Sequence, residues 1–358
     1  MPDWDEALQR MLLRVDATLA GGGEGWPHHA DADTGVWTRS PGGDWTGGFW
    51  NGELWLAAAA TGQHRYRAAA EDWSERLRPR ARSETVFRGF LFWYGAAIGA
   101  VLVKSEAARA VAIEGARGLL TLYNSKAGLV PLGAEAEEAA DVGRSEANID
   151  GVPGGTPLLA WSGNREQALS HAQRHADLCL REDGSVVQSA TFDPATGRAV
   201  RGYTHKGFSD DSTWGRAQAW AMLGFAQAAR IDPDRFAPTA QRVADWWLQH
   251  LPQDRVARWD FDDPDPEAAL DTSATAIATA ALLKLAAIVP GRADTYFKGA
   301  ERSAEALVDR HLRQGGALGE GCYNHRLGLA TRSELIWGDY FLLESLCALT
   351  GRVLTTGI

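Results

Sequence analysis

The most constraining feature of this sequence is a set of six turns, each made of small residues and each leading into an apolar, aromatic-rich segment. These openings lie at residues 46–50, 88–93, 156–161, 212–216, 272–276 and 333–338. After a shorter first step they recur about every sixty residues, which leaves room for two helices and two loops per repeat. Six helical hairpins of this size predict an all-α fold, an (α/α)6 barrel in which an apolar inner ring of helices lies inside an amphipathic outer ring.

Apolar periodicity predicts twelve helices along the chain. They cover residues 3–20, 47–61, 63–79, 89–104, 106–123, 155–162, 165–181, 212–230, 236–251, 271–289, 293–313 and 332–350. Cutting such a ring anywhere would expose apolar faces, so we expect residues 1–358 to form a single catalytic domain. Residues 184–205 instead alternate like a strand around a turn at Asp193 and Pro194, which predicts a short β-hairpin across the mouth of the ring.

Composition and charge exclude several classes of protein. The net charge is −10 without a basic block, which argues against a nucleic-acid partner. No apolar run approaches the roughly 20 residues of a membrane span. The three cysteines have neither metal-site spacing nor a disulfide framework, and the acidic N-terminus is unlike a secretory signal. We therefore expect a cytoplasmic protein with no nucleic-acid or membrane partner, no metal and no cofactor.

The densest cluster of polar and aromatic residues covers 204–220. Arg216 and Trp220 are four residues apart and share a helix face near the mouth of the ring. A buried Arg needs an anionic partner, and its planar fork suits a carboxylate. That carboxylate belongs either to a ligand or to an internal residue such as Asp150 or Asp339. The chain also has fifteen tryptophans, whose flat rings stack on sugars as well as fill cores.

Asp150 is a second candidate for chemistry. It lies in a turn rich in glycine and proline, just ahead of a predicted inner helix, where its carboxylate can point into the mouth. An Asp before a helix is more often a cap, so the local sequence leaves both interpretations open.

Several segments together resemble a known family. They are residues 45–50 with 54–57, 149–159, 171–176, 193–220, 250–252 with 259–264, and 323–324 with 335–341. In these segments the chain resembles the unsaturated glucuronyl hydrolases of glycoside hydrolase family 88 and the related rhamnogalacturonyl hydrolases of family 105. The resemblance covers nearly the whole chain, is most specific in residues 204–220, and implies the same six-hairpin toroid.

This resemblance also implies an activity. The family acts on oligosaccharides that end in a 4,5-unsaturated uronic acid. An Asp protonates C4, water adds at C5, and the resulting hemiketal opens to release the sugar. Asp150 matches the family's Asp. The matching substrate-site positions are Trp45, Trp214, Arg216 and Trp220, with His205 in the same block.

Several positions depart from the family pattern. Phe87 stands where the family has a second essential Asp, Gln188 where it has a His, and Lys206 where it has a Gln. An aromatic residue expected near 134–136 is also absent from the sequence. Arg88 and Lys206 add positive charge where an acidic sugar would lie, so we include Arg88, Gln188 and Lys206 among the candidate substrate-binding residues.

The departures leave three functions open. The chain is an unsaturated uronyl hydrolase with a rebuilt site, another glycosidase or lyase for acidic glycans, or a non-catalytic sugar-binding relative. In each case the partner is an acidic oligosaccharide, and Phe87 is the main argument for the latter two. Because nearby positive charge favours an ionised carboxylate, we expect Arg88, Lys206 and Arg216 to lower the pKa of Asp150.

Overall fold

The chain forms a closed ring of paired helices. A computed structural model describes residues 2–31, 33–139 and 142–358. The inner helices are α2 (Gly47–Thr61), α4 (Arg88–Phe92) continued by η2 (Trp93–Ala97) and α5 (Ile98–Leu102), α7 (Val152–Trp161), α9 (Gly215–Ile231), α11 (Thr272–Ile288) and α13 (Ile336–Leu349). The outer helices are α1 (Trp4–Ala20), α3 (His64–Glu75), α6 (Glu106–Leu120), α8 (Arg165–Cys179), α10 (Pro233–His250) and α12 (Ala293–Arg310). With α4, η2 and α5 counted as one, the described residues contain the twelve predicted helices.

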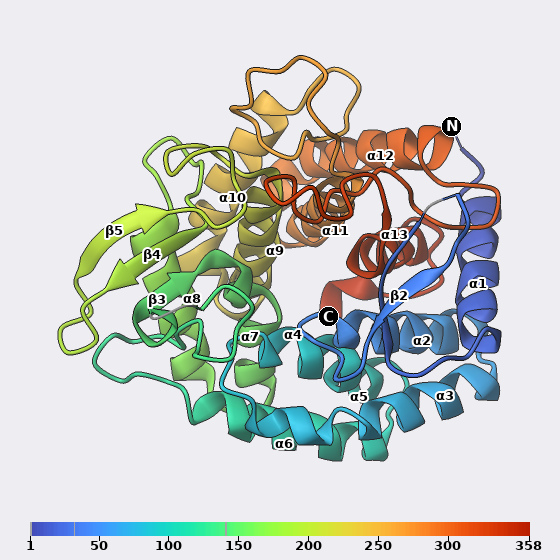
Figure 1. Ribbon diagram of the computed structural model, residues 1–358, viewed down its shortest axis with the longest axis horizontal. Coiled ribbons are helices and arrows are strands. Elements are labelled where there is room, and N and C mark those ends of the chain that lie inside the picture. The colour runs from blue at the N-terminus through green and yellow to red at the C-terminus, as the bar shows by residue number, and fades with distance from the viewer. Residues whose placement is uncertain (1, 32, 140–141) are drawn as a thin grey trace.

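Packing between neighbours closes the ring. Each inner helix contacts the next one along the chain, and α13 returns to α2. Each inner helix also packs on an outer partner, including α1 on α13 as the sequence predicts. Figure 1 looks onto this arrangement, with α2, α7, α9, α11 and α13 around the centre and α1, α3, α6 and α12 outside them. The inner helices α2, α9, α11 and α13 are buried along most of their length, which explains why they are apolar on every side.

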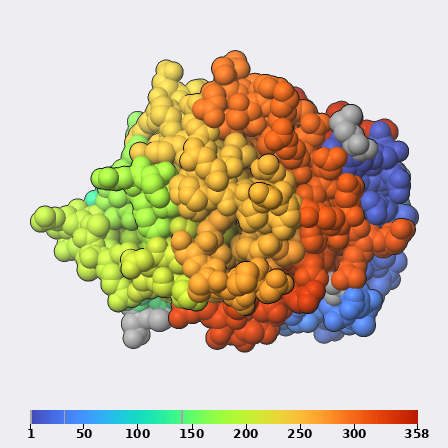
Figure 2. All heavy atoms as spheres, turned by 90° about the horizontal axis from the view of Figure 1, so that it is seen from above, coloured from blue at the N-terminus to red at the C-terminus, as the bar shows by residue number. Residues whose placement is uncertain are grey.

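Short sheets lie at the end of the ring where the inner helices begin. The predicted hairpin is present: β4 (Ser189–Phe192) pairs antiparallel with β5 (Ala199–Tyr203), and β3 (Glu146–Asn148) adds a third strand. The tip of this hairpin projects from the side of the molecule in Figure 2. A second sheet, absent from the sequence prediction, joins β1 (Trp26–Ala30) to β2 (Trp37–Ser40) and β6 (Glu334–Leu335).

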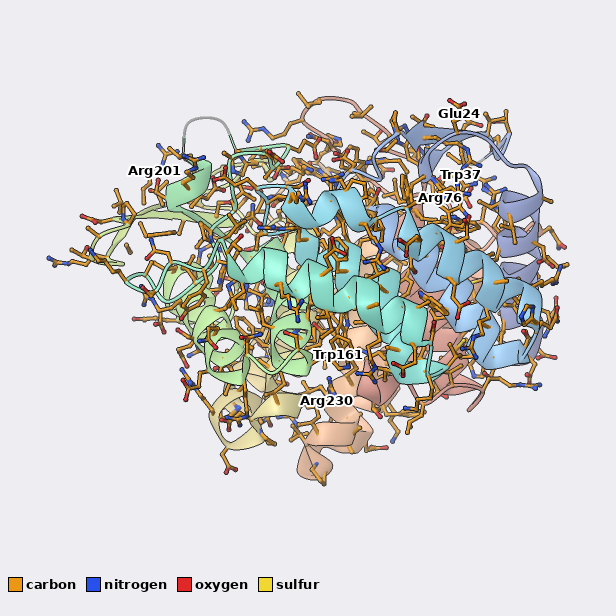
Figure 3. All side chains as sticks on the ribbon, turned by 90° about the horizontal axis from the view of Figure 1, so that it is seen from below. Glu24, Trp37, Arg76, Trp161, Arg201 and Arg230 are labelled. Atoms are coloured by element: carbon orange, nitrogen blue, oxygen red, sulfur yellow. The ribbon has the colours of Figure 1, made fainter. Side chains whose placement is uncertain are left out.

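The two ends of the ring differ. In Figure 3, Trp37 and Arg201 lie at the end that carries the sheets, and Trp161 and Arg230 lie towards the other end. At that other end, the Lys284 ammonium donates to the carbonyls of Thr355 and Ile358, so the C-terminal residues are tied to α11. No described helix is long and apolar enough to cross a membrane.

Two glycines bring the starts of α4 and α7 together. Gly154 has a φ of +77°, and the chain bends sharply there at the start of α7. A Cβ on Gly89 would lie 2.4 Å from the Gly155 backbone nitrogen. This contact leaves no room for a side chain, and it sets Phe87, just before α4, close to Asp150, just before α7.

Candidate active site

A pocket lies among the N-terminal ends of the inner helices and the loops that precede them. It is lined by Trp45, Phe87, Phe90, Glu137, Glu138, Asp150, Lys206, Trp214, Arg216 and Trp220. The free space between these side chains is about 10 Å³, which holds about one water molecule. Six of the nine residues that the sequence singles out are therefore brought together here.

Asp150 is buried at the base of this pocket. The Asn148 side chain accepts a 3.0 Å hydrogen bond from the Asp150 backbone nitrogen and holds the turn, while Oδ1 of Asp150 has no hydrogen-bond partner among the described residues. Burial raises the pKa of Asp150 to about 7, and the Glu138 charge adds to this. Lys206, Arg216 and the Gln188 side chain act in the opposite direction and are outweighed.

The expectation that positive charge lowers the pKa of Asp150 is therefore wrong. The physical reason is that burial dominates, and that each of the two nearby cations is already paired with another carboxylate. Because this pKa is raised to about 7, part of the Asp150 carboxyls keeps a proton near neutral pH. This is the state that a general acid needs.

Aromatic rings form the walls of the pocket. Trp45 packs on Trp337 with ring centroids 4.7 Å apart, and Trp220 packs on Phe90 at 4.8 Å. Phe87 lies parallel to Phe90 at 5.8 Å. These contacts fix flat apolar faces around Asp150, and such faces suit the C–H surfaces of a sugar ring.

Lys206 supplies a buried cation. Its Nζ lies 2.7 Å from Oε1 of Glu138 and 3.5 Å from Oε2 of Glu137, and it lies 4.5 Å from the centre of the Tyr323 ring. Burial lowers the pKa of Lys206, but Glu138, Tyr323 and Glu137 together hold it above the ordinary value. The ammonium therefore stays charged across the neutral range.

Arg216 is also buried, and internal groups bind most of its fork. Its Nη1 donates to Oδ2 of Asp271 and to the Cys322 carbonyl, and its Nη2 donates to the Tyr323 carbonyl, all at 2.6 Å. The internal carboxylate partner is thus Asp271, rather than Asp150 or Asp339. Nε of Arg216 has no partner among the described residues, so its N–H remains for a ligand.

Gln188 and His205 shape the loop that carries Lys206. Oε1 of Gln188 accepts hydrogen bonds from the backbone nitrogens of His205 (2.8 Å) and Lys206 (3.1 Å). His205 Nε2 lies 2.7 Å from Oε1 of the buried Glu146. Burial lowers the pKa of His205, but Glu146 reverses this, and the net shift is upward. Neither Gln188 nor His205 lines the pocket itself.

Arg88 is not in the pocket. Its Nη1 donates to the Ala81 carbonyl at 2.7 Å, and this nitrogen lies so close to Gly118 of α6 that a Cβ there would meet it at 2.8 Å. Burial lowers the pKa of Arg88 to about 10. The guanidinium points towards the outer helices, so the structure does not support its expected place beside the sugar.

Sequence reasoning missed three pocket residues: Phe90, Glu137 and Glu138. Phe90 lies one helical turn after Phe87 and could have been found from that spacing. The two glutamates lie in the segment between α6 and β3, where no periodicity predicts a direction. The Tyr323 hydroxyl donates to Glu137 and holds it over the pocket.

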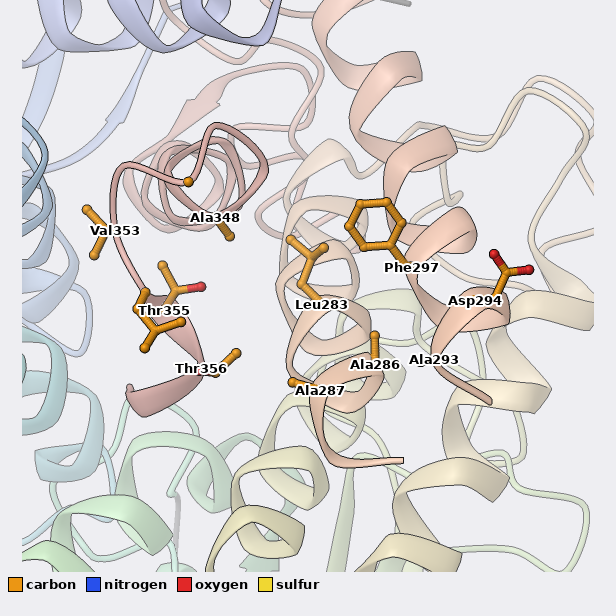
Figure 4. Close-up of a pocket in the computed structure, with 12 residues that line it drawn as sticks. Leu283, Ala286, Ala287, Ala293, Asp294, Phe297, Ala348, Val353, Thr355 and Thr356 are labelled. Atoms are coloured by element: carbon orange, nitrogen blue, oxygen red, sulfur yellow. The ribbon is translucent and has the colours of Figure 1, made fainter. Parts of the chain in front are cut away.

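A second and larger hollow has no such chemistry. It measures about 570 Å³ and lies between α11, α12 and the C-terminal residues. Figure 4 shows its lining, mostly small and apolar side chains such as Leu283, Ala286 and Phe297. No group of three His, Cys, Asp or Glu side chains in the described part of the chain could hold a metal ion.

The pocket thus combines aromatic walls with a buried carboxylic acid of raised pKa in the mouth of an α/α toroid. The model of glycosyl hydrolase family 88 matches residues 149–350. An unsaturated glucuronyl hydrolase of Bacillus sp. (strain GL1) is 32% identical over 97% of this chain and 96% of its own length. An unsaturated chondroitin disaccharide hydrolase of Streptococcus pyogenes serotype M1 is 28% identical over 96% of this chain and 90% of its own length.

Solved structures agree with these matches. One of them, named with the oligosaccharide dGlcA-Glc-Rha-Glc, superposes with a TM-score of 0.90 at 30% identity, over 97% of this chain and 96% of that one. The protein is a glycoside hydrolase. It belongs to glycosyl hydrolase family 88.

Proposed function

We propose that this enzyme hydrates the 4,5-double bond of a terminal unsaturated uronic acid on lyase-derived oligosaccharides. The observation that carries the proposal is Asp150, a buried carboxylic acid with a pKa of about 7 in an aromatic pocket that also holds a buried cation. The relatives named above for unsaturated uronides support the same substrate class.

In this reaction Asp150 gives its proton to C4, and positive charge develops at C5 and on the ring oxygen. Water adds at C5 and returns a proton to the Asp150 carboxylate. The product is a hemiketal, which opens and releases the rest of the oligosaccharide. Trp45, Trp214 and Trp220 provide the faces that hold the ring, and Lys206, with the free Nε–H of Arg216, provides positive charge for the uronate carboxylate.

The test is an absorbance assay. The double bond conjugated to the carboxylate absorbs short-wavelength ultraviolet light, and hydration removes this absorbance. We expect wild-type enzyme to bleach at least one member of a panel of lyase-derived disaccharides, and the Asp150→Asn variant to bleach none. No loss of absorbance across the panel with folded wild-type enzyme would refute the proposed reaction.

We also propose that the ring acts as one catalytic domain in the cytoplasm. The unbroken contacts around the inner helices support a single domain. The three cysteines are buried and free, which suits a reducing compartment. Cell fractionation tests the location: the enzyme activity should be recovered in the same fraction as cytoplasmic marker proteins.

A further inference from the structure

The Glu138 side chain reaches the pocket from a loop, whereas the inner helices position most of the aromatic walls. It comes from the segment between α6 and β3, yet its carboxylate lies beside Asp150 and 2.7 Å from the Lys206 ammonium. The Glu138 side chain is 12% exposed and that of Lys206 is 6% exposed, so this ion pair is largely shielded from water. Oε1 of Glu138 also lacks a well-aligned hydrogen bond from the described residues, so the pairing is mainly ionic.

With Glu138 in place, a sugar ring does not fit. The free space is about 10 Å³, whereas sites for small ligands measure about 300–1,000 Å³. The aromatic walls are packed into the inner ring, and Arg216 is fixed by its three short hydrogen bonds. Glu138 has no comparable set of bonds, so its side chain is the part of the wall that can give way to a ligand.

Displacing Glu138 removes the nearest ion-pair partner of the Lys206 ammonium. A buried cation that loses its partner is strongly destabilised, because its charge is then left uncompensated away from water. Glu137 is 3.5 Å from Lys206 but is already bonded by the Tyr323 hydroxyl, so it compensates only in part. A ligand that brings its own carboxylate restores the pair, whereas a neutral sugar does not.

We propose that Glu138 is an internal stand-in for the substrate's carboxylate, which exchanges with it on Lys206 when the uronide binds. This inference rests on the proposed function and adds a specificity mechanism to it: Lys206 selects an anionic sugar, and Glu138 keeps Lys206 paired until that sugar arrives. Because one carboxylate replaces another, the negative charge beside Asp150 is preserved through the exchange.

A binding titration tests the exchange without turnover. The probe is saturated D-glucuronate, which has no double bond to hydrate, and the signal is the fluorescence of the pocket tryptophans. In the wild type, binding exchanges one Lys206 pair for another, whereas in Glu138→Gln it forms a new pair. We therefore expect the Kd for glucuronate to fall about tenfold in Glu138→Gln, in line with a hydrogen bond to a charged group.

Two further variants make the test specific. Glu135→Gln is the matched control, because Glu135 lies in the same segment but accepts from the Glu84 backbone nitrogen and does not line the pocket. Its Kd should stay within about twofold of wild type. Lys206→Gln should lose most of its preference for glucuronate over neutral D-glucose, and adding Glu138→Gln should not restore it. Unchanged thermal midpoints would show that each variant is folded.

The outcomes separate this inference from the proposed reaction. A glucuronate Kd that is unchanged or higher in Glu138→Gln overturns the exchange, as does the absence of saturable quenching in every variant. A hundredfold loss of kcat at constant KM in Glu138→Gln also overturns it, because Glu138 would then be a second catalytic carboxylate. Failure of the wild type in the absorbance assay refutes the reaction but leaves the titration interpretable.

Discussion

Replacing Asp150 with Asn should abolish turnover and, at neutral pH, make the protein more stable. The pKa of Asp150 is about 7 in the folded protein against an ordinary value of 3.8, and the residue is buried. In the unfolded chain at pH 7 the carboxyl is ionised, so folding requires it to take up a proton or to bury its charge. At about 1.4 kcal/mol per pKa unit, this costs about 4 kcal/mol. Asn has the same shape and no such cost.

The pH dependence identifies the cause. Because the folded pKa is raised, the stabilisation by the neutral carboxyl is fully present below about pH 4 and is lost as the pH rises to about 7. The two proteins should therefore have nearly equal free energies of unfolding at pH 4. The Asn variant should gain an advantage that approaches about 4 kcal/mol by pH 7 and then stays constant. Other titrating groups are common to both proteins and cancel in this difference.

Urea unfolding of both proteins at half-unit steps from pH 4 to 8, followed by tryptophan fluorescence, measures this difference. A stability difference that does not change between pH 4 and 7 would refute the raised pKa. An Asn variant that is less stable at pH 7 would show that the Asp150 carboxylate has a stabilising partner in the folded protein. An Asn variant that still turns over substrate would refute the assignment of the acid.

Two further predictions concern buried cations. Arg216→Lys keeps the charge next to Asp271 but leaves two backbone carbonyls without a donor, so we expect a loss of about 2–4 kcal/mol in urea unfolding together with a raised KM. An unchanged KM would show that Arg216 has only a structural role. Lys284→Met leaves Glu344 buried without its 2.7 Å partner at the far end of the ring, so we expect a loss of about 3–5 kcal/mol with kcat/KM unchanged at 25 °C.

The helices could be predicted because each repeat contains, within a short stretch of sequence, the pattern that specifies its two helices. The turns, the apolar inner segments and the amphipathic outer ones are local patterns, and all twelve helices are confirmed. The sheet of β1, β2 and β6 could not be predicted, because β6 has two residues and pairs with a strand some three hundred positions away. The alternation that identified β4 and β5 is absent from so short a strand.

Whether a predicted residue reaches the pocket depended more on the direction in which its side chain points from the helix than on its residue type. Phe87 and Arg88 are neighbours, and successive residues of a helix point about 100° apart. Phe87 faces the pocket, so Arg88 faces the outer helices, and its charge does not reach the site. A repeat pattern gives the start of an inner helix but not this rotation, which is set by the close contact at Gly89.

The sign of the Asp150 pKa shift depended on pairings that the sequence does not reveal. Counting Lys206 and Arg216 as free cations predicts a lowered pKa. In the folded protein Lys206 is paired with Glu138 and Arg216 with Asp271, so the two positive charges are largely balanced. Burial therefore determines the direction of the Asp150 pKa shift, which is upward.

This balance leads to a last prediction about turnover. The charged groups around Asp150 include Glu138, Lys206, Arg216 and His205, and Glu137 lines the same pocket. If the uronate takes the place of Glu138, the net charge near Asp150 is the same in the free enzyme and in the complex. The alkaline limb of kcat/KM reports the free enzyme, and that of kcat reports the complex. Both kcat/KM and kcat should fall tenfold per pH unit above a common midpoint near 7. The reason is that the protonated form of Asp150 is lost in the free enzyme and in the complex alike.

In the Glu138→Gln variant the two pH profiles should no longer share a midpoint. Its free enzyme lacks the negative charge beside Asp150, so the pKa of Asp150 falls and the midpoint of kcat/KM moves to lower pH. Its complex contains the substrate's carboxylate in the same place, so the midpoint of kcat should not move. Initial rates between pH 5 and 9, at substrate concentrations below and above KM, separate the two limbs. A shift of both midpoints would mean that Glu138 remains beside Asp150 during turnover, and a shift of neither would mean that its charge does not reach the acid.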